Sequence, residues 1–214
     1  MKQSKPIIGV TGITGSGTST VSAILADAGG FVISADNEAH KVMQKGEDGY
    51  NEILQHFSES ILAPDGEIDR KKLGGIVFDN PAKLKLLESI IHPKVIERIH
   101  SLLSEKLIFT QESPPNLASP FAVIDAPLLV EAGIHKLCNS VWLVTATDDT
   151  RLGRIMARDN INIDTAKQRL NSRAGDGHIR PFADVIIENN SGIAQLRSNV
   201  MHYFLQLTLK GIYK

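Results

Sequence analysis

Short hydrophobic runs alternate with segments of helical periodicity along most of the chain. Residues 6–11 form a run rich in β-branched side chains that ends at a cluster of glycines, which is typical of a buried parallel strand leading into a loop. Residues 20–28 then have a helical pattern. Four further apolar runs predict strands, at residues 31–35, 121–126, 140–145 and 184–188. Because helical stretches separate these strands, the pattern predicts an α/β fold whose parallel sheet has helices on both faces.

A long section, residues 37–120, separates the second and third predicted strands. Its patterns are helical: Asn80 and Pro81 mark a helix start, and Leu84, Leu87 and Ile90 lie on one apolar face. Residues 110–120 contain serine, asparagine and three prolines and are expected to form a surface loop. The section is too long for a simple crossover, so we expect an inserted helical subdomain at about 37–120.

Composition limits the classes of ligand and partner. With 214 residues, 42% of them hydrophobic, the chain can bury a substantial core as a single domain. A net charge of -1 provides no overall field for a nucleic-acid backbone, so we expect a small anionic ligand at a local site and no nucleic-acid partner. The single cysteine, Cys138, excludes an internal disulfide and is expected to fill apolar space. No run approaches the roughly 20 apolar residues that span a bilayer, and no signal peptide is evident, so we expect a cytoplasmic protein without membrane contact.

A glycine-rich segment follows the first predicted strand and precedes a helical run. Residues 12–20 read Gly-Ile-Thr-Gly-Ser-Gly-Thr-Ser-Thr, which is close to the Walker A pattern in its required strand-to-helix context. The glycines allow successive backbone amides to approach one anion, and the helix presents its positive end. We therefore expect ATP to bind to Gly12, Gly15, Ser16, Gly17, Thr18, Ser19 and Thr20, with the Ser19 hydroxyl as a ligand of Mg²⁺. The alternative is an ordinary glycine-rich turn.

Thr18 departs from the Walker A pattern. It occupies the position of the lysine whose ammonium group normally bridges the β- and γ-phosphates. A threonine supplies a hydroxyl but no charge. Either a cation elsewhere in the chain supplies that charge, or the protein binds nucleotide and transfers phosphate slowly or not at all.

Asp36 follows the second predicted strand, at the edge where open α/β sheets bind ligands. A carboxylate there can orient an attacking hydroxyl group and accept its proton. The alternative role is an N-cap of the helix that begins at Asn37.

Further motifs follow in order along the chain: Asp69-Arg70-Lys71-Lys72-Leu73, Leu87-Glu88-Ser89-Ile90-Ile91-His92-Pro93, Asp125-Ala126-Pro127-Leu128-Leu129-Val130-Glu131 and Ala183-Asp184-Val185-Ile186-Ile187-Glu188-Asn189-Asn190. Together with the glycine loop and the Ser34-Ala35-Asp36 strand end, they resemble the dephospho-CoA kinase family over residues 7–192. The resemblance implies transfer of the γ-phosphate of ATP to the ribose 3′-hydroxyl of dephospho-CoA, with Mg²⁺. It also implies a P-loop kinase-type core, a helical subdomain that holds the CoA portion, and a helical lid.

The resemblance also assigns acceptor-side roles. Asp36 would be the base, Asp125 would lie near Mg²⁺ and the acceptor, and Arg70 and His92 would lie on the CoA-binding side. Pro127 and Leu128 would shape the acceptor pocket. The structural alternatives are that His92 closes a helix before Pro93, that Arg70 is a solvated surface charge, and that Asp125 caps a strand end.

Basic residues gather in the segment expected to form the lid. Arg151, Arg154 and Arg158 share one helix face, and we expect Arg154 and Arg158 to act as catalytic residues on the phosphate chain; the alternative is a solvated basic face. Arg173 or Arg180 could also supply the charge missing at position 18. Asn189, after the last predicted strand, is in a position to meet the adenine; the alternative is a turn-forming residue.

These observations divide the chain into a nucleotide-binding core at about 6–36, 121–150 and 183–214, the helical acceptor subdomain, and a lid at about 151–182. The expected function is dephospho-CoA kinase. The alternatives are another nucleoside or nucleotide kinase, and a nucleotide-binding protein that has weak or lost catalysis because of Thr18. A GTPase is disfavoured because the chain has no Asn-Lys-x-Asp segment.

Overall fold

The computed structural model describes residues 5–109, 121–171 and 175–209. The expected loop at 110–120 and Arg173 lie outside these residues. The described chain divides into two compact units, residues 34–105 and the remainder, and long helix α5 passes from one into the other at residue 105.

The larger unit is built on a five-stranded sheet with the order β2-β3-β1-β4-β5. Its strands are β1 (Ile7–Gly12), β2 (Phe31–Ser34), β3 (Ala122–Asp125), β4 (Ser140–Thr145) and β5 (Val185–Glu188). Strand β1 pairs in parallel with β3 and β4, and β4 pairs in parallel with β5. All five strands lie where the hydrophobic runs predicted them, and the predicted α/β class is confirmed. Because β1 and β4 are buried on both faces, their sequences are nearly continuous apolar runs rather than alternating ones.

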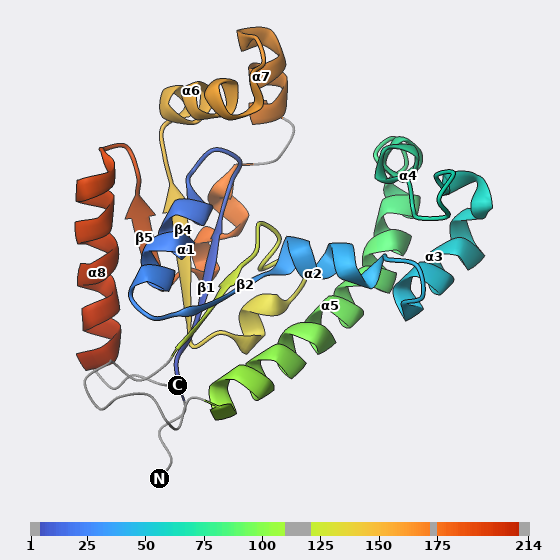
Figure 1. Cartoon of the computed structure of the whole chain (residues 1–214). Helices are drawn as coiled ribbons and strands as arrows, with labels where there is room; N and C mark the ends of the chain where they lie inside the picture. The colour runs from blue at the N-terminus through green and yellow to red at the C-terminus, as the bar shows by residue number, and fades with distance from the viewer. Residues whose placement is uncertain (1–4, 110–120, 172–174, 210–214) are drawn as a thin grey trace. The chain divides into compact units, whose positions relative to one another are not determined.

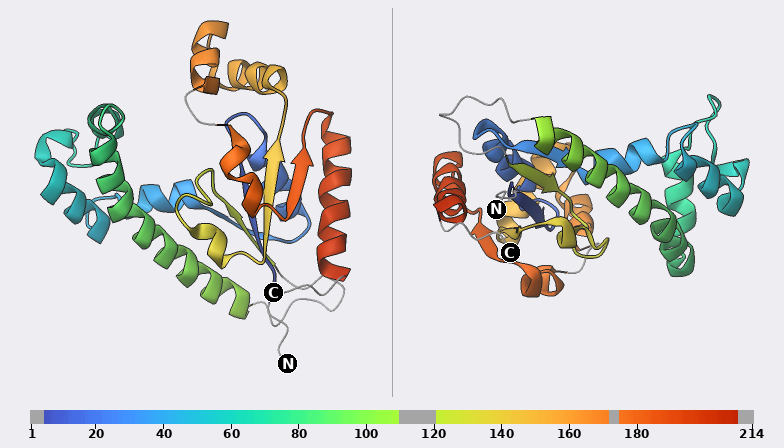
Figure 2. Two further views of the ribbon diagram at one scale, coloured as in Figure 1. Left: turned by 180° about the vertical axis from the view of Figure 1, so that it is seen from behind. Right: turned by 90° about the horizontal axis from the view of Figure 1, so that it is seen from below.

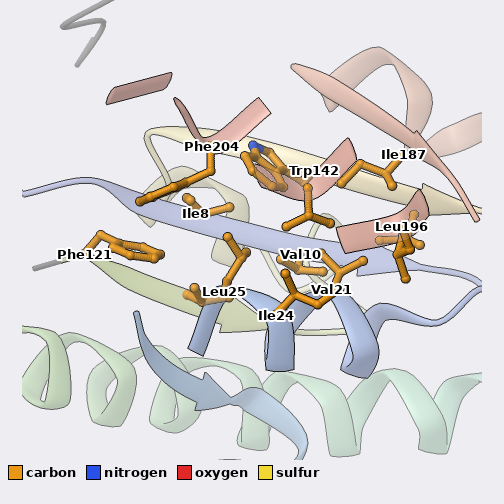
Figure 3. Close-up of a cluster of buried hydrophobic side chains, with 13 residues drawn as sticks. Ile8, Val10, Val21, Ile24, Leu25, Phe121, Trp142, Ile187, Leu196 and Phe204 are labelled. Carbon is orange, nitrogen blue, oxygen red and sulfur yellow. The ribbon is translucent and has the colours of Figure 1, made fainter. Parts of the chain in front are cut away.

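One face of the sheet carries two α-helices, α1 (Thr18–Asp27) and α8 (Ile193–Leu209), which pack against each other and against the strands (Figure 1). Leu196, Val200 and Phe204 are the buried residues of α8, at helical spacing. The Phe121 and Phe204 rings lie 4.4 Å apart between their centroids in this core (Figure 3). The buried cluster consists of Ile8, Val10, Val21, Ile24, Leu25, Phe121, Val123, Trp142, Val144, Ile187, Leu196, Val200 and Phe204.

The opposite face is covered by short 3-10 helices and turns. Side chains alternate along a strand, so Gly9 faces away from the cluster that contains Ile8 and Val10. A Cβ atom on Gly9 would lie 2.7 Å from the Sγ atom of Cys138 and 2.8 Å from Leu129, which shows how closely the segment after β3 packs there. The view from behind in Figure 2 shows this face. Its 3-10 helices are η3 (Ile134–Leu137), η4 (Asp176–His178) and η5 (Arg180–Phe182).

Two helices follow β4 at its carboxyl end, α6 (Asp148–Asp159) and α7 (Ile163–Asn171), and they pack against each other (Figure 1). Thr147 caps α6 by accepting a hydrogen bond from the Thr150 amide. Asn160 ends the helix in the left-handed conformation, with φ of 51°. These helices cover most of the region expected to form the lid.

The smaller unit is helical. It contains α2 (Ala35–Val42), α3 (Asp48–Phe57), η1 (Glu59–Ile61), α4 (Arg70–Val77) and the part of α5 (Pro81–Phe109) that precedes residue 106. The buried Glu38 carboxylate accepts hydrogen bonds from Lys41 Nζ at 2.8 Å and from Arg98 Nε at 3.2 Å, so its charge is paired. Helix α5 begins after Asn80, whose side chain accepts from the Lys83 amide, and it continues through Pro93.

Candidate active site

The phosphate loop connects β1 to α1 at the carboxyl end of the sheet. Gly15 and Gly17 adopt the left-handed conformation, with φ of 83° and 99°, which favours glycine at both positions. Gly17 is also the N-cap of α1, and its carbonyl oxygen accepts hydrogen bonds from the Thr20 and Val21 amides. The loop therefore has the backbone conformation of an anion-binding turn at a helix N-terminus.

Gly12 is closely enclosed at the end of β1. A Cβ atom there would lie 2.5 Å from Ser16 Oγ and 2.5 Å from the Val144 carbonyl oxygen. The Ser16 hydroxyl is buried and has no hydrogen-bond partner among the residues that the structure describes. Thr18 and Thr20 are partly buried in the first turn of α1, whereas Ser19 is exposed. A hydroxyl group in this first turn is thus accessible to a ligand of the loop.

Two arginines of α6 hold the loop on its carbonyl side. Arg151 donates from Nε to the Thr14 carbonyl oxygen at 2.8 Å and also pairs with Asp148. Arg154 donates from Nη1 to the carbonyl oxygens of Gly15 at 3.3 Å and Ser16 at 3.1 Å. The contact is close, since a Cβ atom on Gly15 would lie 3.0 Å from the Arg151 carbonyl oxygen. The structure therefore brings both arginines to the phosphate loop, as contacts to its backbone.

Arg158, on the same helix, makes a different contact. Its guanidinium group pairs with Asp159, and its side chain is 63% exposed. This hydrogen bond raises the pKa of Arg158 and lowers the pKa of the Asp159 carboxyl to about 2, with Arg169 contributing less. Arg180 similarly pairs with Asp176 at 2.9 Å. The structure brings neither arginine to the phosphate loop.

Asn189 lies directly after β5 and is 4% exposed. Its amide donates to the Thr145 carbonyl oxygen at 2.8 Å, and its Nδ2 donates to the Ser16 carbonyl oxygen, also at 2.8 Å. The neighbouring Asn190 accepts from the Thr147 amide at the start of α6. The Asn189 side chain thus holds the phosphate loop in the structure, and its place near the adenine stays a prediction.

Asp125 is the last residue of β3 and stands opposite Val10 of β1 in the parallel register. Asp125 therefore lies on the strand directly next to β1, which leads into the phosphate loop. Pro127 and Leu128 are partly buried in the turns that follow, and Glu131 ends this motif. His178 Nε2 lies 2.7 Å from Glu131 Oε1, and this hydrogen bond is the main cause of the raised pKa of His178. Sequence reasoning missed the pair, because no local pattern relates residue 131 to residue 178.

Three candidate residues belong to the smaller unit. Asp36 is exposed in the first turn of α2, and Arg70 is exposed at the first position of α4. His92 is partly buried within α5. Two structural alternatives for these residues are wrong: the N-cap of α2 is Ser34 rather than Asp36, and His92 does not close a helix because α5 continues beyond Pro93. Ser34, the last residue of β2, caps α2 two residues before the N-cap inferred from the sequence.

Comparisons with known proteins agree with the motifs. Residues 6–195 match the sequence profile of the family described as Dephospho-CoA kinase. The chain is similar to Dephospho-CoA kinase of Carboxydothermus hydrogenoformans, with 36% identity covering 92% of this chain and 91% of that protein. The protein of the same description from Fusobacterium nucleatum is 39% identical, covering 92% of this chain and 96% of that one.

Solved structures give the same result. The Thermus thermophilus protein TT1252 has a TM-score of 0.74 and 30% identity, covering 95% of this chain and 98% of that one. Dephospho-CoA kinase from Campylobacter jejuni has a TM-score of 0.66 and 30% identity, covering 97% and 99%. Shikimate kinase from Acinetobacter baumannii, at 17% identity with a TM-score of 0.53, shares the fold. No helix of the described residues is both long and apolar enough to cross a membrane.

Proposed function

This chain belongs to the dephospho-CoA kinase family, and on that premise we propose how its residues carry out the reaction. The chain is an ATP-dependent kinase that phosphorylates the ribose 3′-hydroxyl of dephospho-CoA, giving coenzyme A and ADP. In this transfer the hydroxyl oxygen forms a bond to the γ-phosphorus atom, and the bond from that phosphorus to the β–γ bridging oxygen breaks. The hydroxyl proton passes to a base of the enzyme.

The phosphate loop binds the triphosphate of ATP in this proposal. Gly12, Gly15 and Gly17 allow the loop backbone to approach the phosphates, and Thr18 and Thr20 offer hydroxyl donors in the first turn of α1. The observation that supports this most directly is the left-handed conformation of Gly15 and Gly17 at a helix N-terminus, with the loop carbonyls of residues 14–16 held by Arg151, Arg154 and Asn189.

Magnesium fits the donor atoms of this site. The exposed Ser19 hydroxyl and the Asp125 carboxylate are oxygen donors, which Mg²⁺ prefers, and Mg²⁺ in such sites takes few protein ligands beside phosphate and water. When bound, the ion would neutralise charge on the phosphate oxygens. We assign Ser19 as its ligand and Asp125 to its vicinity.

Asp36 is the proposed base. It is an exposed carboxylate two residues after β2 ends, and it makes no hydrogen bond with any residue that the structure describes, so it is available to a substrate hydroxyl. Arg70 and His92 belong to the smaller, helical unit, which we propose holds the CoA portion; Pro127 and Leu128 shape the acceptor pocket. Arg70 would pair with an anionic group of the acceptor.

A substrate panel tests the proposal. Purified enzyme with Mg²⁺ and ATP is offered dephospho-CoA, nucleosides and nucleoside monophosphates, with ADP release measured and products identified by mass spectrometry. We expect turnover with dephospho-CoA and one coenzyme A formed for each ADP released. Turnover confined to another acceptor would refute the assignment of the acceptor, and tight ATP binding without any transfer would indicate that Thr18 has cost the chain its catalysis.

A further inference from the structure

The guanidinium group of Arg154 joins two segments that are far apart in the sequence. Its Nη1 donates to the carbonyl oxygens of Gly15 and Ser16, and its Nη2 donates to the Asn189 carbonyl oxygen at 2.9 Å and to Asn189 Oδ1 at 3.1 Å. Both terminal nitrogens are therefore engaged at the back of the phosphate loop. In this structure the Arg154 side chain therefore binds the loop backbone and Asn189 rather than extending freely from the lid region.

Asn189 completes a closed network with Arg154 and Ser16. The Ser16 carbonyl oxygen accepts from both Arg154 Nη1 and Asn189 Nδ2, while Asn189 Oδ1 accepts from Arg154 Nη2. The side chain of Asn189 is buried, and its backbone amide is fixed to β4 through the Thr145 carbonyl oxygen. This Arg154–Asn189–Ser16 network fixes both the orientation of the Ser16 carbonyl group and the position of the guanidinium charge.

The charge lies next to the position where the pattern lacks a lysine. Arg154 Nη1 is 3.6 Å from the place that a Cβ atom would take on Gly17, the residue before Thr18. The N–H group of Gly17 belongs to the same peptide unit as the Ser16 carbonyl. A cation that donates to this carbonyl polarises the unit, which makes its N–H a stronger donor to an anion on the other side.

We propose that Arg154, held by Asn189, compensates for the missing lysine at position 18 by placing a fixed positive charge on the carbonyl side of the phosphate loop. Arg154 and Asn189 are then positioning residues for the nucleotide, in contrast to the catalytic and adenine-binding roles that the sequence suggested. The inference rests on the proposed binding of ATP at this loop, but it does not depend on the identity of the acceptor.

A double-mutant cycle with Mg-ADP as the probe tests this compensation. Mg-ADP affinity is measured by isothermal titration calorimetry for the natural chain, Arg154→Met, Thr18→Lys and the double variant. Because a charge-assisted network is lost, Arg154→Met should weaken binding by about ten- to a hundredfold. If a lysine at position 18 supplies the same charge, adding Thr18→Lys to the Arg154→Met variant should recover most of the lost Mg-ADP affinity. In the natural chain, Thr18→Lys should change the Mg-ADP affinity little. Equal fold-losses from Arg154→Met in both backgrounds, or no loss in either, would overturn the proposal.

Two further variants separate charge from folding. Arg154→Lys keeps the charge but loses the planar fork, so it should retain more Mg-ADP affinity than Arg154→Met, and equal losses would contradict an electrostatic role. If Arg154→Met does not fold, Arg154→Lys is compared with the natural chain instead, and a loss of a hundredfold or more would contradict that role. Arg197→Met removes a surface arginine that pairs with Asp27 in the same unit, and its Mg-ADP affinity should equal that of the natural chain. All these measurements omit dephospho-CoA, so a negative result in the substrate panel would leave their outcome interpretable.

Discussion

Asn189 Nδ2 and the Ser16 carbonyl oxygen form a 2.8 Å hydrogen bond across 173 residues of sequence, and Gly17 lies directly beside it. A Cβ atom on Gly17 would lie 2.3 Å from Asn189 Nδ2, closer than real Cβ contacts allow. The close approach of the loop backbone to Asn189 thus requires glycine at position 17, in addition to the requirement set by its positive φ.

Gly17→Ala should therefore displace Asn189 and disturb the phosphate loop. Since the substitution combines a clash with a φ of 99°, we expect a loss of stability of about 1–3 kcal/mol. Nucleotide affinity should fall as well.

The matched control is Gly153→Ala, on the exposed side of α6, where a Cβ atom meets nothing within 4 Å. Alanine in a helix should stabilise the protein by about 0.5–1 kcal/mol. Urea unfolding and Mg-ADP titration measure both variants, and an unaffected Gly17→Ala protein would contradict the role given to this contact.

Asp36→Asn tests the proposed base. Removing the proton acceptor while keeping the shape of the side chain should lower kcat by about 10²- to 10⁴-fold. Mg-ATP affinity should stay nearly the same, because the substitution leaves the phosphate loop intact. Asp27→Asn, at an exposed carboxylate on α1, serves as the control for loss of one negative charge. Normal turnover in the Asp36 variant would leave Asp36 as a surface residue of α2.

The His178–Glu131 pair predicts a pH-dependent contact between η4 and the segment after β3. The Glu131 carboxylate raises the pKa of His178, so this contribution to stability is fully present below the unfolded pKa of about 6.5 and is lost as pH rises through the higher folded value. Glu131→Gln should lower the pKa of His178, as followed by NMR titration of its imidazole protons. An unchanged His178 titration would show that the pair does not form in solution.

Cys138 should behave as a packing residue rather than a reactive thiol. Burial raises the pKa of its thiol to about 12, with a smaller contribution from Asp184, and its Sγ atom lies against Gly9 of β1. The thiolate fraction at pH 8 is therefore very small, and thiolates are the reactive species. A disulfide reagent such as Ellman's reagent should label the folded protein far more slowly than the urea-unfolded chain. Rapid labelling of the folded protein would contradict this environment.

Local patterns predicted most of the architecture because their physical basis is local. The five buried strands are short runs rich in β-branched residues, and the glycines of the phosphate loop lie next to one another in the chain. The buried residues Leu196, Val200 and Phe204 of α8 likewise recur at the local spacing of a helix. Family motifs dispersed along the chain then indicated which substrate the protein uses, and no single local pattern could have shown this.

The contacts of the site were decided only by the tertiary structure. Arg151, Arg154 and Arg158 share one helical face in the sequence, yet the first two hold loop carbonyls and the third pairs with Asp159. The pattern could not separate them, because each partner is chosen by where α6 meets the loop after the chain has folded. The same is true of Asn189: a turn-forming residue in the sequence becomes a buried partner of Ser16 because parallel strands bring their carboxyl ends to one edge of the sheet.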